Sequence, residues 1–157
     1  MGPGGIHLRR FFLDDAISDD RLRAVLAECW GMACEDVTVI DTVEDLARLP
    51  DGRLAILRFH HPGSPFPVSV EIYPRGPAER PFPYRGMEDF AVRLAKALPA
   101  RVLTDDDATL DPFCGLLFGQ DGRIAEVDMQ PDEATGADIV HARHRRYRPS
   151  SDDPGPP

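Results

Sequence analysis

Two apolar runs in the middle of the chain constrain its fold more than any other feature. Residues 53–60 (RLAILRFH) are almost continuously apolar, which is typical of a strand covered on both faces. In residues 66–73, apolar and polar side chains alternate, as in a strand with one buried face. The apolar set that should share that face is Phe66, Val68, Val70 and Ile72. The turn residues of 62–65 (PGSP) separate the runs, so we predict an antiparallel hairpin in which 53–60 is a central strand.

Two longer segments carry the spacing of amphipathic helices. Ser18 is a good N-cap, and acidic residues follow it at the positive end of a helix predicted over 19–30. Its apolar positions are Leu22, Val25, Leu26, Cys29 and Trp30. A second helix is predicted over about 87–98, ended by Pro99, with Phe90, Ala91, Leu94 and Leu98 on one face.

Shorter elements fill the intervals between these segments. We predict a strand at 37–40, followed by a short helix that Thr42 caps. Further strands are predicted at 101–104, 113–118 and 123–129, and the last two should form a second hairpin around the Gly119–Gly122 turn. After Pro131 the pattern dissolves, apart from a short strand at 139–140.

These elements predict one α+β domain, in which two main helices pack on a mostly antiparallel sheet. The chain of 157 residues is long enough to bury a proper core. We expect a flexible N-terminus over 1–10, the domain over 11–148, a stiff proline-rich loop over 74–83 and a disordered tail over 149–157. The side chains expected to be buried are Leu26, Trp30, Ile56, Phe59, Val70, Phe90, Leu94 and Leu117.

The charge of the chain restricts the kind of partner it can bind. Asp and Glu number 27 against 18 Lys and Arg, for a formal net charge of -9. Such a chain is repelled by nucleic acid and by anionic membranes and is attracted to cationic surfaces, so we expect a protein partner with a basic surface. No apolar run reaches the roughly 20 residues of a membrane span, and we expect a cytoplasmic protein.

The three cysteines, Cys29, Cys34 and Cys114, are odd in number and contain no CxxC pair. That usage fits reduced thiols better than a disulfide framework. Cys29 lies on the apolar face of the first predicted helix, so we expect it to act as a small core side chain.

The densest acidic group follows the strand predicted at 101–104. Asp105, Asp106 and Asp107, with Asp111 nearby, carry the oxygen ligands of a hard cation but lack the alternation and closing Glu of an EF-hand. Three consecutive side chains do not converge on one ion without an unusual loop. We therefore expect this acidic loop to meet a basic partner or solvent, with Glu71 as a further member of the surface.

The histidines and the C-terminal arginines have ordinary interpretations. His60 and His61 are adjacent and would point to opposite faces of a strand, and His141 and His144 have no further metal ligand in register. The basic stretch 143–148 resembles a nucleic-acid contact in composition, but the acidic charge of the whole chain opposes that function. We expect surface histidines, no metal ion, and a basic tail that folds back on the acidic body or lies in solvent.

An enzymatic alternative rests on two other sets of residues. Glu71, Glu126 and Asp128 lie on predicted strands, where paired carboxylates on one sheet face would supply acid and base groups. Cys114 is a candidate nucleophile, although its apolar neighbours are typical of a buried, inert thiol. The chain contains no GxSxG, Walker A, HExxH or GxGxxG motif, and we expect no cofactor.

Part of the chain resembles the small acidic immunity proteins of bacterial polymorphic-toxin systems. The resemblance rests on residues 94–98 (LAKAL), 101–106 (RVLTDD), 116–122 (LLFGQDG) and 127–128 (VD), about a quarter of the chain. It implies an α+β inhibitor without catalytic residues that binds a toxin domain and blocks its active site. We therefore predict a non-enzymatic binding protein that neutralises a basic toxin or effector domain, with a small enzyme or ligand-binding protein as the alternative.

Overall fold

The computed structural model describes residues 9–49, 53–74, 87–105, 113–131 and 140–148. These residues form a single α+β domain built on one mixed sheet of eight strands. The strands are β1 (Arg9–Leu13), β2 (Val37–Ile40), β3 (Leu54–His60), β4 (Val68–Pro74), β5 (Val102–Asp105), β6 (Cys114–Phe118), β7 (Ile124–Pro131) and β8 (Val140–Tyr147). The helices are α1 (Asp19–Trp30), the short α2 (Val43–Leu46) and α3 (Met87–Ala97), with a single 3-10 turn at Cys34–Asp36.

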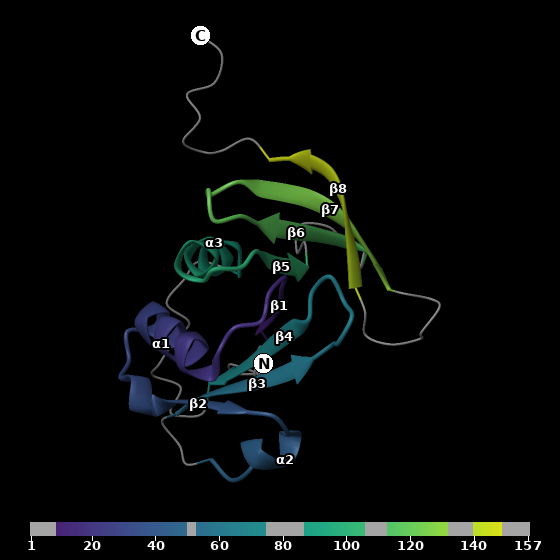
Figure 1. The fold of residues 1–157 in the computed structure, drawn as a ribbon. Coiled ribbons are helices and arrows are strands. Elements are labelled where there is room, and N and C mark those ends of the chain that lie inside the picture. The colour runs from purple at the N-terminus through teal and green to yellow at the C-terminus, as the bar shows by residue number, and fades with distance from the viewer. Residues whose placement is uncertain (1–8, 50–52, 75–86, 106–112, 132–139, 149–157) are drawn as a thin grey trace, which may run out of the picture.

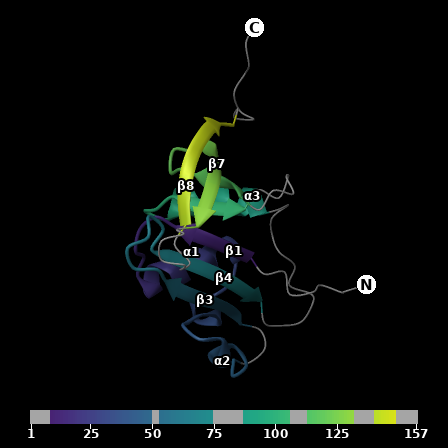
Figure 2. The same cartoon turned by 90° about the vertical axis from the view of Figure 1, so that its right-hand side faces the viewer.

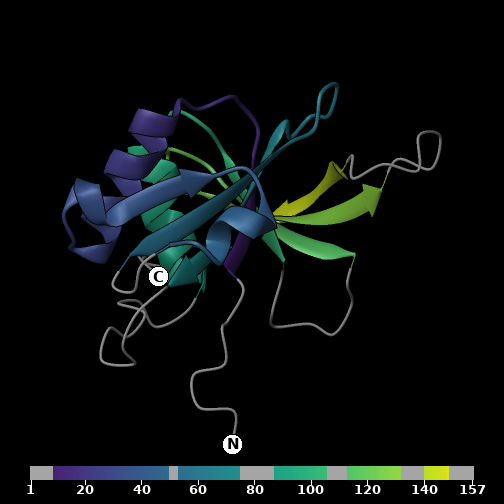
Figure 3. The ribbon, with the colours of Figure 1, turned by 90° about the horizontal axis from the view of Figure 1, so that it is seen from below.

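The strands lie in the order β2-β3-β4-β1-β5-β6-β7-β8. Every pair of neighbours is antiparallel except β2 and β3, which are parallel. Helices α1 and α3 lie side by side on one face of the sheet, here called the helical face, whereas α2 lies beside β2 and β3 at one end (Figure 1 and Figure 3). In Figure 2, β7 and β8 run in a different direction from β3 and β4, as expected from twist accumulated across eight strands.

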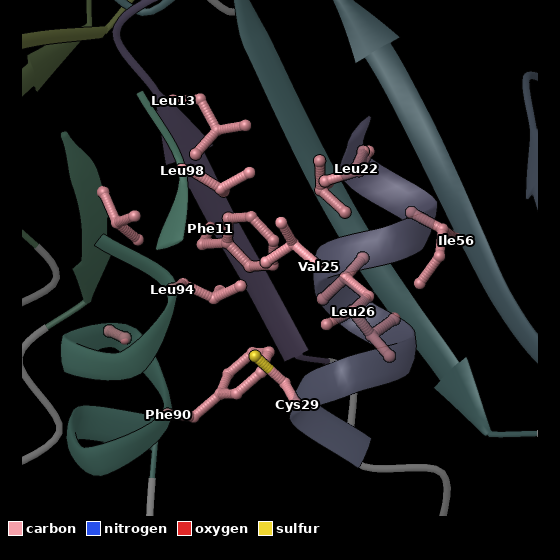
Figure 4. Close-up of a cluster of buried hydrophobic side chains, with 14 of the residues drawn as sticks. Phe11, Leu13, Leu22, Val25, Leu26, Cys29, Ile56, Phe90, Leu94 and Leu98 are labelled. Atoms are coloured by element: carbon pink, nitrogen blue, oxygen red, sulfur yellow. The ribbon is translucent and has the colours of Figure 1, made fainter. Parts of the chain in front are cut away.

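The main core lies between the helical face and the two long helices. Figure 4 shows Leu22, Val25 and Leu26 of α1 facing Phe90, Leu94 and Leu98 of the α3 region, with Phe11 between them. All six of these aliphatic and aromatic helix positions are less than a tenth exposed. The Phe90 ring is edge-on to Phe11 at 6.1 Å and to Trp30 at 5.1 Å between ring centroids. This edge-to-face geometry is the favoured one for aromatic pairs and gives the core one defined packing.

Local capping explains why α1 begins and ends where it does. The Ser18 hydroxyl accepts a hydrogen bond from the Arg21 backbone N–H, and Asp19 and Asp20 occupy the first turn, where carboxylates favour the helix dipole. Gly31 ends the helix in the left-handed conformation, with φ of 64°, which glycine adopts without steric cost. The predicted helix over 19–30 is therefore confirmed, and α3 agrees with the second prediction to within one residue.

Most of the predicted strands are also confirmed. The pairings of β3 with β4 and of β6 with β7 are the two predicted hairpins, and Thr42 accepts the Asp45 backbone N–H at the start of α2. The predictions of reduced thiols and of a buried Cys29 are also confirmed, because none of the three cysteines forms a disulfide and Cys29 is buried.

Four details of the sequence-based prediction need correction. Phe66 precedes β4 and packs in a second cluster on the opposite face of the sheet, because Pro67 separates it from the alternation that begins at Val68. Phe59 and Leu117 are half-buried, since they also lie on that opposite face, where α2 is the sole helix among the described residues. Strand β1 begins at Arg9, inside the segment expected to be flexible.

The fourth correction concerns the C-terminal part of the domain. The prediction of a short strand at 139–140 followed by a basic tail is wrong, because Val140–Tyr147 forms the eight-residue edge strand β8. The remaining predictions for 1–8, 75–83, 106–107, 111 and 149–157 lie outside the described residues.

Removing the central aromatic of β1 should be costly. In Phe11→Ala, a fully buried ring that contacts Phe90 is lost, and we expect the free energy of unfolding to fall by about 3–5 kcal/mol. Phe113→Ala makes the same chemical change at a ring that is 56% exposed, and should change that energy by about 0.5 kcal/mol or less. Urea unfolding of both variants measures the difference, and equal destabilisation would contradict the central position of β1.

Candidate functional site

Among the described residues, the negative charge is concentrated in the first part of the domain. Residues 14–46 hold ten carboxylates against two arginines, a formal charge of -8. Seven of these carboxylates are exposed and three are half-buried. The exposed ones are Asp15, Asp19, Asp20, Glu28, Glu35, Asp41 and Glu44. These carboxylates lie on α1 and α2 and in the segments before α1, before β2 and after β2, and β2 and α2 are at the opposite end of the sheet from β8 (Figure 1).

A single arginine organises the densest part of this surface. Arg58 on β3 is 11% exposed and forms ion pairs with Asp19 at the start of α1 and with Asp41 after β2, the latter at 3.0 Å. The two terminal nitrogens of this mostly buried guanidinium pair with carboxylates, which links β3 to the start of α1 and to the segment after β2. Asp20, Glu44 and Asp45 extend the surface on either side. We call these five carboxylates around Arg58 (Asp19, Asp20, Asp41, Glu44 and Asp45) the acidic end.

The two described residues that were predicted to bind a partner lie outside the acidic end. Asp105 is exposed at the end of β5, whereas Asp106, Asp107 and Asp111 lie outside the described residues. Glu71 is half-buried on β4, and β1 lies between β4 and β5 in the sheet. The described part of the predicted site therefore consists of two carboxylates on separate strands. The acidic end was missed because its members come from three short segments, although the excess of acidic residues over 14–46 is visible in the sequence.

The structure does not bring together the carboxylates of the enzymatic alternative. Residues that pair across antiparallel strands share a face of the sheet. Glu71 pairs with Leu57, which packs near α2, whereas Glu126 pairs with Leu116, which belongs to the core under α1 and α3. Asp128 shares the face of Glu126. The hypothesis of one carboxylate site built from all three residues is wrong, because β4 and β7 present them on opposite faces.

Glu126 and Asp128 instead hold the edge strand β8 in place. Arg146 is hydrogen-bonded and ion-paired with Glu126, and Arg145 lies 3.6 Å from the Asp128 carboxylate. Arg148 reaches Glu88 on α3 at 2.7 Å and Glu126 at 3.6 Å. The arginines of the expected tail therefore do fold back on the acidic body, and they do so as part of a strand.

The remaining candidate residues have partners that explain them structurally. Half-buried Cys114 lies 3.8 Å from the Arg145 guanidinium, and the His61 ring is 2.8 Å from the Ser69 hydroxyl. The centroid of the His144 ring lies 4.7 Å from that of Tyr147, with the two rings tilted relative to each other. Among the described residues, no three His, Cys, Asp or Glu side chains gather in a way that would hold a metal ion. None of the described helices is long and apolar enough to cross a membrane.

Comparisons with known proteins provide no further assignment. The chain matches no protein family, no curated protein and no solved structure. The geometry and charge of the described residues are therefore the basis for the function proposed below.

The ion pairs of β8 predict a local effect of one substitution. Arg146 holds the pKa of Glu126 below its ordinary value through their hydrogen bond, against the opposing effect of partial burial. In Glu126→Gln this carboxylate is lost, and we expect backbone hydrogen exchange in β8 to rise by about twofold to fivefold, as for a surface ion pair. Asp89→Asn, on the exposed side of α3, is the control. Exchange mass spectrometry resolves β8 from the core, and unchanged rates in β8 would refute this role of Glu126.

The raised pKa of the Tyr73 hydroxyl predicts a loss of stability at alkaline pH. The pKa of Tyr73 is raised to about 12, mainly by burial and also by the hydrogen bond that the Tyr73 hydroxyl donates to Glu71 at 2.9 Å. Because the unfolded chain releases this proton near pH 10, the folded state keeps more protons between these values, and stability falls as pH rises through the window. Tyr73→Phe should lower the free energy of unfolding at neutral pH. Between about pH 10 and 12 the variant should lose less of that free energy than the wild type does. Urea midpoints across the window test this, with Tyr147→Phe as the control at an exposed ring.

Proposed function

We propose that the protein is a non-enzymatic binding protein that neutralises a basic toxin or effector domain, as an immunity-type inhibitor. The observation that carries this proposal is the excess of carboxylates on and around α1 and α2, where residues 14–46 have a formal charge of -8. A surface of one sign steers an oppositely charged partner and raises its association rate. The same surface would disfavour nucleic acid and anionic membranes as partners.

The acidic end is also built as a rigid surface. Arg58 joins the start of α1 to the end of β2, so the carboxylates around it are held by the fold and not by a long connection. Glu44 and Asp45 lie in the first turn of α2, which Thr42 caps. A pre-organised surface loses less conformational entropy on binding, which favours tight association. Occlusion of a basic active site by such a surface would inhibit a toxin without any catalytic group in this chain.

Charge removal tests the proposal once the partner has been identified by co-expression with the adjacent gene. Asp20→Asn combined with Glu44→Gln removes two exposed charges from the acidic end, and Asp89→Asn combined with Asp121→Asn removes two exposed charges elsewhere. We expect the first pair to slow association on the order of threefold to tenfold at low salt, and the second pair to have little effect. Stopped-flow association rates at increasing salt should converge as screening over about 8 Å removes the difference.

A third variant distinguishes the two acidic surfaces. Asp105→Asn, Asp106→Asn and Asp107→Asn together remove the charge of the loop predicted from sequence to bind the partner. If this variant slows association and the acidic-end variant does not, the interface lies at the loop. Binding that is insensitive to salt and to all of these substitutions, or a partner that is a small molecule or an enzyme substrate, would overturn the proposed function.

A further inference from the structure

The face of the sheet opposite α1 and α3 contains a hollow that the proposed function does not use. Its volume is about 430 Å³, within the range of small-molecule sites. It lies between the connection of β3 to β4, which contributes Phe66, and strands β6, β7 and β8. Figure 3 shows this connection and the three strands diverging on the side of the sheet away from α1.

Small side chains create the space in the hollow. Its floor is formed by Leu117 of β6, Ala125 and Val127 of β7, and Ala142 of β8. Ala125 pairs with Tyr147 and Val127 pairs with His144, so these two floor residues of β7 lie opposite aromatic ones, whereas Ala142 pairs with Met129. Of these residues, Leu117 and Ala142 are half-buried and border the open part of the hollow, whereas Ala125 and Val127 are less than a tenth exposed. Phe66, which is 3% exposed, forms the opposing apolar wall.

Aromatic rings form one side of the hollow. The His144 and Tyr147 rings lie 4.7 Å apart at an interplanar angle of 59°, and the Arg123 guanidinium lies 5.1 Å from the centroid of Tyr147. Tyr147 is 53% exposed, so much of its side chain is accessible from solvent. An exposed ring next to a small-residue floor is suited to stacking against a flat ligand.

One cation at this rim is available to a ligand. Arg101 is held by Asp14, with 2.6 Å between the guanidinium and the carboxylate. Arg123 lies 3.8 Å from Asp121, with both side chains about two-thirds exposed, and Arg123 makes no side-chain hydrogen bond to the described residues. An ion pair this long and exposed contributes little to stability. An anionic group of a ligand can therefore replace Asp121 or bind Arg123 together with it. Arginine binds carboxylates in a planar, two-point geometry.

We propose that this hollow binds a small planar aromatic molecule that carries one carboxylate. The ring of the ligand lies over Leu117 and Ala142, between Phe66 and Tyr147, and its carboxylate contacts Arg123. The volume accommodates one or two fused rings. This binding site is independent of the acidic end, which lies beyond β1, β4 and β3 in the strand order.

The test uses naphthoate and its neutral counterpart, naphthylmethanol, as probes on the full-length protein. We expect naphthoate to shift the methyl resonances of Ala125, Ala142 and Leu117, and to bind about tenfold more tightly than the alcohol. Arg123→Gln should reduce naphthoate affinity about tenfold and leave the affinity for the alcohol within about twofold. Arg93→Gln, at an exposed arginine on α3, should change neither affinity.

A second pair of variants tests the space itself. Ala142→Leu fills the hollow from the half-buried edge strand and should abolish binding of both probes, whereas Ala33→Leu adds the same volume at an exposed position and should not. A cooperative thermal unfolding transition serves as the check that each variant is folded. Equal affinity for the two probes, binding that survives Ala142→Leu, or absence of methyl shifts at millimolar naphthoate would overturn the proposal. A partner protein that shifts these methyls when neither probe binds would also overturn it, because the hollow would then take a side chain.

Discussion

The fold depends on the insertion of β1 between β4 and β5. β1 pairs with β4 over five residues and with β5 over two, so it connects the half of the sheet that contains β2, β3 and β4 to the half that contains β5 to β8. The short contact with β5 is reinforced by Asp14, whose carboxylate accepts hydrogen bonds from the Arg101 backbone and side chain at 2.7 and 2.6 Å. Alternation along the strand sends Phe11 and Leu13 into the helical core and Phe12 to the opposite face.

The two faces of the sheet consequently have different roles. On the helical face, α1 and α3 bury a continuous core, and removal of apolar area from water there stabilises the domain. On the opposite face, coverage is divided between α2 at one end and the Phe66 connection near the other. This incomplete coverage leaves room for the hollow beside β8, and it explains why Phe59 and Leu117 are half-buried although both lie on strands.

Charge is distributed along the sheet in a similarly uneven way. The carboxylates on and around α1 and α2 outnumber nearby arginines, whereas Arg145 and Arg146 of β8 and the following Arg148 are paired with Asp128, Glu126 and Glu88. The exposed edge of β8 carries charged side chains, a common protection of edge strands against unwanted pairing. Among the described residues, the excess negative charge therefore lies at the acidic end and not at β8.

The sequence alone determined the elements whose signals are local: the capped helix α1, the amphipathic α3, and the hairpins β3–β4 and β6–β7, where periodicity and turn residues lie within one segment. It also determined the net charge and the absence of disulfides. Only the tertiary structure decided that Arg9–Leu13 is a central strand and that Val140–Tyr147 is an edge strand. β1 is too short for a periodic pattern, and the basic, polar composition of β8 carries none. Both are strands because distant segments satisfy their backbone hydrogen bonds and charges. The same long-range pairing separated Glu71 from Glu126 and brought Phe66 towards Tyr147, which no spacing along the chain specifies.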